Sequence, residues 1–248
     1  MFIHNGFIVI LIFLFLFENV PIYAGNHFRI FGGSETSIEK HPWMVSLQHS
    51  SLGHFCGGSL INYDTILTAA HCIIGDSASF HLVAGTSRLV DKGFTLKIKN
   101  ITVHEKWTMS PNLKNKYDIA IIKLAEKVKF SKRVKTILLP DQDIKVPVGT
   151  ALVVAGWGDI GSHGPQSDVL KEATVSVMES DSERLIYAWD KKSGVCSTDS
   201  GGPLELNGTL VGIVSFGPAK CEENSQPAGY TNVAFFRGWI KETLEYYE

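Results

Sequence analysis

The sequence Cys196-Ser-Thr-Asp-Ser-Gly-Gly-Pro203 contains Ser200, the first candidate functional residue of the chain. Asp199 precedes Ser200, and two glycines and a proline follow it, a composition that suits a tight, strained turn. Such a turn can hold one hydroxyl out of the fold and leave backbone N–H groups free beside it. The same residue types also form ordinary surface turns, so this stretch alone is compatible with both interpretations.

Three further stretches favour the first interpretation because of their order along the chain. They are Arg29-Ile-Phe-Gly-Gly33, Thr68-Ala-Ala-His-Cys72 and Tyr117-Asp-Ile-Ala-Ile-Ile122. Together with the stretch around Ser200 they resemble the trypsin/chymotrypsin family of serine proteases, from Ile30 to the C-terminus. The resemblance implies an all-β fold of two antiparallel six-stranded β-barrels with a C-terminal α-helix, and an active site in the cleft between the barrels.

The composition and the apolar patterning agree with an all-β globular protein. The chain of 248 residues can bury a sizeable core, and its formal net charge of −2 gives no electrostatic reason to expect a nucleic-acid partner. Many short strand-like runs, separated by turns with Gly and Pro, indicate a sandwich or a barrel. The exception is the tail, where Phe236, Ile240 and Leu244 have helical spacing and predict an amphipathic helix packed on the core.

The N-terminal residues predict export from the cell. The unbroken apolar run from Phe7 to Phe17 is too short to span a membrane and suits a signal-peptide core, with a small-residue cleavage site after Ala24. A signal anchor is the alternative. We expect a signal peptide at 1–24, an activation propeptide at 25–29 and a protease domain at 30–248. The expected product is secreted, extracellular and monomeric, with no membrane partner.

The four cysteines are interpreted as two disulfides. They are Cys56, Cys72, Cys196 and Cys221, and none belongs to a C-x-x-C pair of the kind typical of zinc sites. The residues alone leave three pairings open, and the resemblance implies Cys56–Cys72 and Cys196–Cys221. Disulfides need an oxidising compartment, in agreement with export. We expect no cofactor and no metal, since Gly85 to Phe94 lacks the carboxylate pair of a calcium loop.

His71, Asp118 and Ser200 form the predicted catalytic triad. A serine hydroxyl needs a base within hydrogen-bond reach, and the base needs a partner that fixes its tautomer. By resemblance, Ser200 is the nucleophile, His71 the base and Asp118 its partner, with Ser215 a candidate second donor to that carboxylate. Asp118 directly precedes the apolar run Ile119 to Ile122, where an unpaired carboxylate would be costly.

The predicted oxyanion hole is where the chain departs from the family. By resemblance its donors are the N–H groups of Ser200 and Thr198, and the family has glycine at the second position. A β-branched threonine resists backbone angles that glycine accepts. One alternative is that the site needs such angles and the Thr198 peptide rotates its N–H away. The other is that the backbone stays in an ordinary region and the donor survives, with the side chain crowding the leaving-group side.

The predicted specificity pocket carries no charge. Gly194 lies six residues before Ser200, where trypsin-like members carry an aspartate that selects Arg or Lys. The walls implied by the resemblance are Gly217 and Ala228, with Val195 beside the floor. Because a cationic side chain would be costly to bury there, we expect cleavage after Phe, Tyr, Leu or Met. Ala228 narrows the pocket and favours the smaller of these.

Activation is predicted to follow a cut after Arg29. The resemblance implies that the new α-amine of Ile30 turns inward and pairs with Asp199. That pair would order the turn that holds the oxyanion donors. The chain is therefore expected to be a zymogen, with an activating protease as a partner in addition to its protein or peptide substrates.

A second departure from the family lies between Met178 and Tyr187. The family carries a longer loop there, with its own disulfide, whereas this segment is short and has no cysteine, so the pocket rim is expected to be more mobile or open. Together with Thr198, the short loop motivates an alternative function: a catalytically weak or inactive homologue that acts by binding. Asn100-Ile-Thr and Asn207-Gly-Thr match the glycosylation pattern, and the second falls in an expected hairpin turn.

Overall fold

The computed structural model describes residues 30, 32–73, 79–108, 117–159, 161, 164–221 and 226–247. The expected signal peptide at 1–24 and propeptide at 25–29, with Arg29, lie outside this set and stay predictions. No helix within it is long and apolar enough to cross a membrane.

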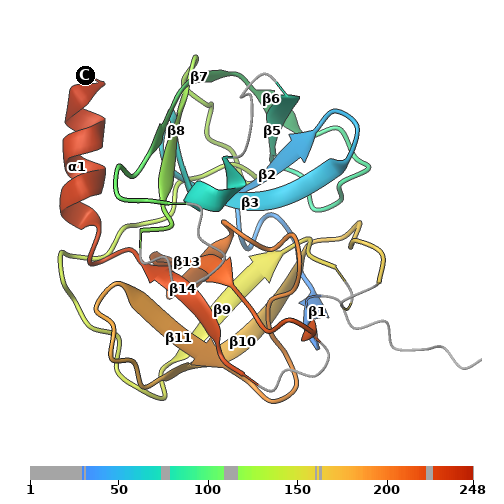
Figure 1. Ribbon diagram of the computed structural model, residues 1–248. Coiled ribbons are helices and arrows are strands. Elements are labelled where there is room, and N and C mark those ends of the chain that lie inside the picture. Colours follow the sequence, from blue (N-terminus) through green and yellow to red (C-terminus); the bar gives the residue numbers. More distant parts are fainter. Residues whose placement is uncertain are drawn as a thin grey trace, which may run out of the picture.

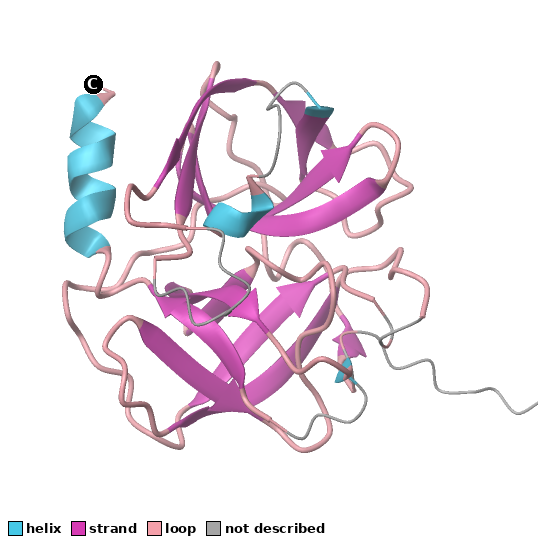
Figure 2. Cartoon of the chain, viewed as in Figure 1, coloured by secondary structure: helices cyan, strands magenta, loops and turns pink. Residues whose placement is uncertain are grey.

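Strands make up nearly all of the regular structure and form two sheets, one above the other in Figures 1 and 2. The upper sheet contains β2 (Met44–His49), β3 (Gly53–Asn62), β4 (Thr65–Thr68), β5 (Phe80–Ala84), β6 (Phe94–Leu96), β7 (Ile98–Val103) and β8 (Ala120–Leu124). The lower sheet contains β1 (Ser34–Glu35), β9 (Ala151–Gly156), β10 (Lys171–Met178), β11 (Leu185–Trp189), β12 (Pro203–Leu206), β13 (Thr209–Phe216) and β14 (Ala228–Asn232). A 3₁₀ turn covers Ala70–Cys72, and helix α1 covers Arg237–Tyr246.

The lower sheet is a closed antiparallel barrel. Its order is β1-β10-β11-β14-β13-β12-β9, and β9 also pairs with β10, so the ring closes and β1 remains attached outside it. Strand β10 alternates between buried and less buried positions along its length, as expected for a strand with one face in a core. The enclosed apolar cluster includes Val154, Val175, Val214 and Tyr230.

The upper sheet curls into a less completely closed barrel. Its order is β6-β5-β2-β3-β4-β8-β7. The two edge strands, β6 and β7, are consecutive parts of one segment and are separated only by Lys97. The segment therefore pairs with β5 by its first part and with β8 by its second. The prediction of an all-β fold of two antiparallel barrels is confirmed. We call the upper sheet the first barrel and the lower sheet the second barrel; the second barrel is more completely closed than the first.

Helix α1 follows the second barrel in the chain but packs on the first. Its buried Ile240, together with Phe236 just before it, belongs to the apolar cluster of the first barrel. Trp239 stacks on His104, with 5.0 Å between the ring centroids. The predicted amphipathic helix is confirmed, and its apolar stripe is core packing that holds the end of the chain against the first barrel (Figure 1).

The two glycosylation motifs lie at exposed positions. Asn100 is on β7, and Asn207 is in the turn between β12 and β13, where its φ is +49°.

His41 is a buried histidine between two carboxylates. Its Nε2 lies 2.7 Å from Glu172 Oε2, and its Nδ1 lies 3.5 Å from Glu205 Oε2, a charge contact rather than a well-formed hydrogen bond. Burial lowers the pKa of His41, but Glu205 and Glu172 outweigh it and raise the pKa above the usual 6.5. Its contribution to stability is therefore fully present below the unfolded-state pKa and is lost as the pH rises through the folded-state pKa.

We expect the urea midpoint of the protein to decline as the pH rises from 6 to 9. A His41→Asn variant should lose the part of this decline that the titration of His41 causes, because the imidazole is absent. A His81→Asn variant, in which a half-buried histidine of β5 is replaced, serves as the control and should keep the decline. An unchanged pH profile in His41→Asn would contradict the assignment.

Candidate active site

The turn that carries Ser200 is held against both barrels. The N–H of Gly57 on β3 donates to Ser200 O at 2.7 Å, and the N–H of Gly201 donates to Val214 O on β13 at 2.8 Å. Gly201 has φ +79°, and a Cβ there would collide with Gly57 O and Thr68 Oγ1. Only glycine satisfies both the left-handed angle and the close approach of the chains. The first glycine after Ser200 therefore seats the serine at the junction of the barrels.

Asp118 and His71 form a closely bonded pair at the same junction. His71 lies in the 3₁₀ turn after β4, and Asp118 lies just before β8. Asp118 Oδ2 is 2.7 Å from His71 Nδ1, and Oδ1 accepts the backbone N–H of His71 at 2.9 Å. Because the carboxylate can only accept, the ring proton is on Nδ1 and Nε2 is left as an acceptor.

A third donor to Asp118 comes from the second barrel. Ser215 Oγ donates to Asp118 Oδ2 at 2.6 Å, and both side chains are buried. Ser215 lies where the pairing of β13 with β14 shifts register between Val214 and Phe216. Such an irregularity re-aims a side chain. The buried carboxylate thus receives donors from both barrels, in the contacts that the family resemblance implies.

His71 and Ser200 line one cavity of about 320 Å³. Its other walls are mostly apolar and include Phe55, Phe80 and the disulfide of Cys56 and Cys72. The His71 side chain is 33% exposed, so its ring is accessible from this space. In the described part of the chain, Ser200 Oγ makes no hydrogen bond; catalytic contacts of this kind are often long before substrate binds.

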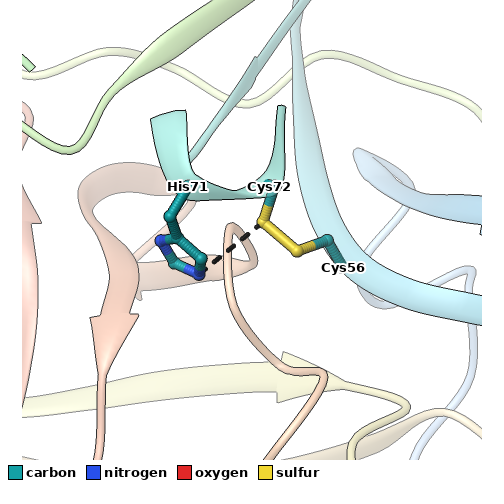
Figure 3. Close-up of side chains that lie close together, drawn as sticks. All are labelled: Cys56, His71 and Cys72. Carbon is teal, nitrogen blue, oxygen red and sulfur yellow. Dashed lines mark hydrogen bonds between the residues drawn. A yellow bond between two sulfur atoms is a disulfide. The ribbon is translucent and has the colours of Figure 1, made fainter. Parts of the chain in front are cut away.

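Cys56, His71 and Cys72 bring three atoms of metal-ligand type within 4.8 Å of one another. The two sulfurs are bonded to each other, however, and neither is a thiolate that could bind zinc. Figure 3 shows His71 beside this disulfide, with its Nε2 3.9 Å from Cys72 Sγ. The group is therefore a histidine braced by a disulfide. The second disulfide joins Cys196 to Cys221, and both pairs are those implied by the resemblance.

Thr198 adopts a left-handed backbone conformation, with φ +68°. This region costs a β-branched residue about 1–3 kcal/mol. Within the described residues, the N–H groups of Thr198 and Ser200 donate to no protein acceptor. The alternative of an ordinary backbone at Thr198 is therefore wrong: the site does use the unusual angle, and the threonine adopts it.

Asp199 is a fully buried carboxylate in the second barrel. Its Oδ1 accepts from Gly158 N–H at 2.8 Å and its Oδ2 from Cys196 N–H at 3.0 Å. Burial raises its pKa to about 7, against the lowering effect of these two donors, and nearby Asp159 adds to the rise. Among the described residues no cation contacts it. The Ile30 side chain is completely buried in the apolar cluster of the same barrel.

The predicted specificity positions lie around Val195. Gly194 precedes it and is buried, and Ala228 belongs with Val195 to the apolar cluster of the second barrel. A Cβ at Gly217 would lie 3.4 Å from Val195 Cγ2, in ordinary contact. The structure therefore brings together four residues that are small or apolar and carry no charge.

An aromatic pair joins the end of the short Met178–Tyr187 segment to β13. Tyr187 on β11 meets Phe216 edge-on, with 6.1 Å between the ring centroids. The Phe216 ring also covers Gly229 on β14 so closely that a Cβ at Gly229 would collide with it. Packing of Phe216 thus links β13, β14 and β11 at the pocket rim.

Gln166 and His54 were not singled out from the sequence, yet both contact Thr198. Gln166 Nε2 donates to Thr198 Oγ1 at 3.2 Å and to His54 O at 2.7 Å. His54 Nε2 lies 3.2 Å from Thr198 O. No local pattern marks either residue. The only signal is the threonine itself, because a strained residue requires contacts that compensate it.

The two-barrel fold, with a serine beside a His–Asp pair at the junction, is that of the serine proteases. A family model described as Trypsin matches residues 30–240. Trypsin theta of Drosophila melanogaster is 38% identical over 233 residues, which cover 88% of this chain and 87% of the relative. Trypsin 5G1 of Aedes aegypti is 35% identical over 228 residues, with coverages of 86% and 84%. The chain therefore belongs to the trypsin family.

Among solved structures, human heparin binding protein is similar over 86% of this chain and 96% of its own, with a TM-score of 0.79 and 28% identity. This likeness agrees with the fold assignment.

Proposed function

We propose that this protein is a secreted serine endopeptidase, made as a zymogen, activated by cleavage after Arg29 and selective for aromatic or large apolar residues. The observation that carries the catalytic part is the buried Asp118 carboxylate, which holds His71 through two contacts and Ser215 through a third. This arrangement leaves an accessible imidazole nitrogen in the cavity that also contains Ser200.

In the proposed reaction, Ser200 Oγ attacks the substrate carbonyl while its proton moves to His71 Nε2. Asp118 keeps the ring oriented and stabilises the imidazolium. The carbonyl oxygen becomes an oxyanion that accepts hydrogen bonds from the N–H groups of Ser200 and Thr198. His71 then gives the proton to the leaving amine, which departs and leaves an acyl-serine ester. Water, deprotonated by His71, hydrolyses the ester and restores the serine.

The activation step is supported by the surroundings of Asp199. Its carboxylate is fully buried, and its two donors within the described residues are backbone N–H groups. A buried carboxylate without a cation is costly, and the raised pKa reflects that cost. The ammonium of a newly cut Ile30 would offset it. Because the Ile30 side chain is already in the same core, the cut would need to move only a short segment.

The apolar preference is supported by the uncharged positions Gly194, Gly217 and Ala228. The relatives are named trypsins, but none of the four positions assigned to the pocket, Gly194, Val195, Gly217 and Ala228, carries a carboxylate for a basic side chain. Export is supported by two disulfides, which persist in oxidising compartments. An activating protease, peptide substrates and a monomeric state complete the proposal. The alternative of a weak homologue that acts by binding gains no support from the comparisons.

The test is labelling by a fluorophosphonate probe, which reacts with an activated serine and needs no knowledge of the substrate. We expect labelling after trypsin cleavage of the purified chain, and none in Ser200→Ala. Arg29→Gln should stay unlabelled because the cut is blocked. Absence of labelling in a folded, correctly cleaved protein would overturn the proposed activity. Equal labelling before cleavage would overturn the zymogen part alone.

The pocket predicts a measurable selectivity. For matched peptide substrates of the cleaved enzyme, kcat/KM should be at least about 100-fold higher with Phe or Leu before the cut bond than with Arg, because an unpaired cation is costly to bury. Gly194→Asp should narrow this ratio by supplying a carboxylate. A preference of the unaltered enzyme for Arg or Lys would contradict the assigned pocket.

A further inference from the structure

Thr198 is held at its side chain and at both flanking peptides. On one side, the N–H of Asp159 donates to Ser197 O at 2.9 Å. On the other, His54 Nε2 lies 3.2 Å from Thr198 O. The hydroxyl accepts from Gln166 Nε2 at 3.2 Å. A residue at φ +68° that should prefer another conformation is thus fixed at three points.

The contact from Asp159 sets the direction of the Thr198 N–H. Ser197 O and Thr198 N–H belong to the same peptide unit, and in a trans peptide they point in opposite directions. With the carbonyl held by Asp159, the N–H is turned to the other side, where it donates to no acceptor among the described residues. The rotation of this peptide is therefore determined by its neighbours.

The His54 ring supports the other peptide of Thr198. Thr198 O can only accept, so His54 Nε2 carries the proton and Nδ1 accepts from Ser46 Oγ at 2.8 Å. Burial lowers the pKa of His54 to about 4 and outweighs the raising effect of its bond to Thr198 O. The ring is therefore neutral at physiological pH and keeps this single tautomer.

The orientation of the Gln166 amide follows from its two partners. His54 O, 2.7 Å from Nε2, accepts only, so the NH₂ group must face it. The second N–H of the same group then goes to Thr198 Oγ1. Gln166 thus ties the Thr198 side chain to the strand that carries His54.

The Thr198 side chain also interacts with the carboxyl of Asp159. Burial raises the pKa of the Asp159 carboxyl, and a hydrogen bond with the Thr198 side chain counteracts the rise. Asp159 and Gln166 face each other in an antiparallel bridge, which sets both beside Thr198. Glycine at 198 would have no hydroxyl for these two residues to hold.

We propose that Gln166 is a positioning residue of the oxyanion hole, whose amide bridges Thr198 Oγ1 and His54 O and so holds Thr198 in the left-handed conformation that presents its N–H to the oxyanion. The inference deepens the proposed function and rests on it. A glycine would adopt positive φ without support. In this chain the hydrogen bond from Gln166 to the Thr198 hydroxyl supports that conformation instead.

The test compares Gln166→Met, similar in size but unable to donate, with Gln142→Met. Gln142 is an exposed glutamine that also donates to a backbone carbonyl, that of Phe235, but lies next to α1. We expect Gln166→Met to lower kcat about 10- to 100-fold with little change in KM, because the oxyanion donor acts in the transition state. Gln142→Met should match the unaltered enzyme. A crystal structure of cleaved Gln166→Met should show Thr198 at negative φ.

The decisive comparison is made in a Thr198→Gly variant of the protein. There, Gln166→Met should change kcat by less than about twofold, since glycine needs no support and the two positions no longer couple. Thr198→Val, which replaces the hydroxyl by a methyl group, should behave like Gln166→Met and serves as a second test variant if Gln166→Met folds poorly. Retention of positive φ or of full kcat in Gln166→Met, or an equal loss in the Thr198→Gly background, would overturn the inference. Failure of the unaltered chain to label would instead overturn the proposed function, and the φ measurement would still decide what holds Thr198.

Discussion

Replacement of Asp118 by asparagine is expected to lower kcat about 10⁴-fold, the size of loss that this change causes in a Ser-His-Asp triad. The carboxylate accepts from the His71 backbone, the His71 ring and the Ser215 hydroxyl. An amide has a single acceptor oxygen, and its NH₂ would oppose a donor. The imidazole would then carry its proton on Nε2, where it cannot accept the proton of Ser200.

The measurement is kcat of the cleaved enzyme at neutral pH, with a thermal unfolding scan to confirm the fold. Asp168→Asn is the matched control, since that aspartate is exposed on a loop, and its kcat should be unchanged. A loss in Asp118→Asn of less than about tenfold would remove Asp118 from the proposed triad.

Replacement of Asp199 by asparagine is expected to lower kcat of the cleaved chain by about 10²–10³-fold, the cost of one oxyanion donor. The neutral side chain would keep the space between Gly158 and Cys196 but could not form an ion pair with the amine of Ile30. The turn that carries Thr198 and Ser200 would then lose the restraint that cleavage provides in the proposed activation.

The melting temperature provides an independent test of the ion pair that is proposed to form between Ile30 and Asp199 on activation. In the uncut chain the pKa of Asp199 is raised to about 7, so its contribution to stability is present below the unfolded-state value near 3.8 and is lost as the pH rises through 7. A cationic partner would lower that pKa and reverse the loss. In a Ser200→Ala background, which prevents self-digestion, cleavage should raise the melting temperature more at pH 8 than at pH 5. Asp199→Asn should abolish the difference, and its persistence there would exclude the pair.

The sequence predicted those parts of the fold that depend on neighbours in the chain. The tail helix around Ile240 follows from its apolar spacing, and the short strands follow from their turns. The residues of the site came from local motifs around His71, Asp118 and Ser200, whose contacts then depend on the barrels that bring them together. The incomplete closure of the first barrel depends on which edges the segment at Lys97 can reach, and no local pattern contains that information.

The support of Thr198 lay beyond the sequence for the same reason. Gln166 and His54 are separated by 112 positions, and Ser215 reaches Asp118 across 97 positions through an irregularity in strand pairing. The sequence indicated that Thr198 is unusual at its position. The contacts that hold it depend on where the Gln166 side chain lies in three dimensions, which composition and spacing do not determine.

The close cover of Gly229 by the Phe216 ring has a consequence for protein engineering and for divergence among relatives. Any side chain at position 229 would have to displace the Phe216 ring, which belongs to the last residue of β13, next to Gly217 of the predicted specificity pocket. The two positions cannot be optimised one at a time. Libraries that vary the pocket rim should therefore randomise 216 and 229 jointly, and a scan of single substitutions would record position 229 as intolerant when only its partner forbids the change.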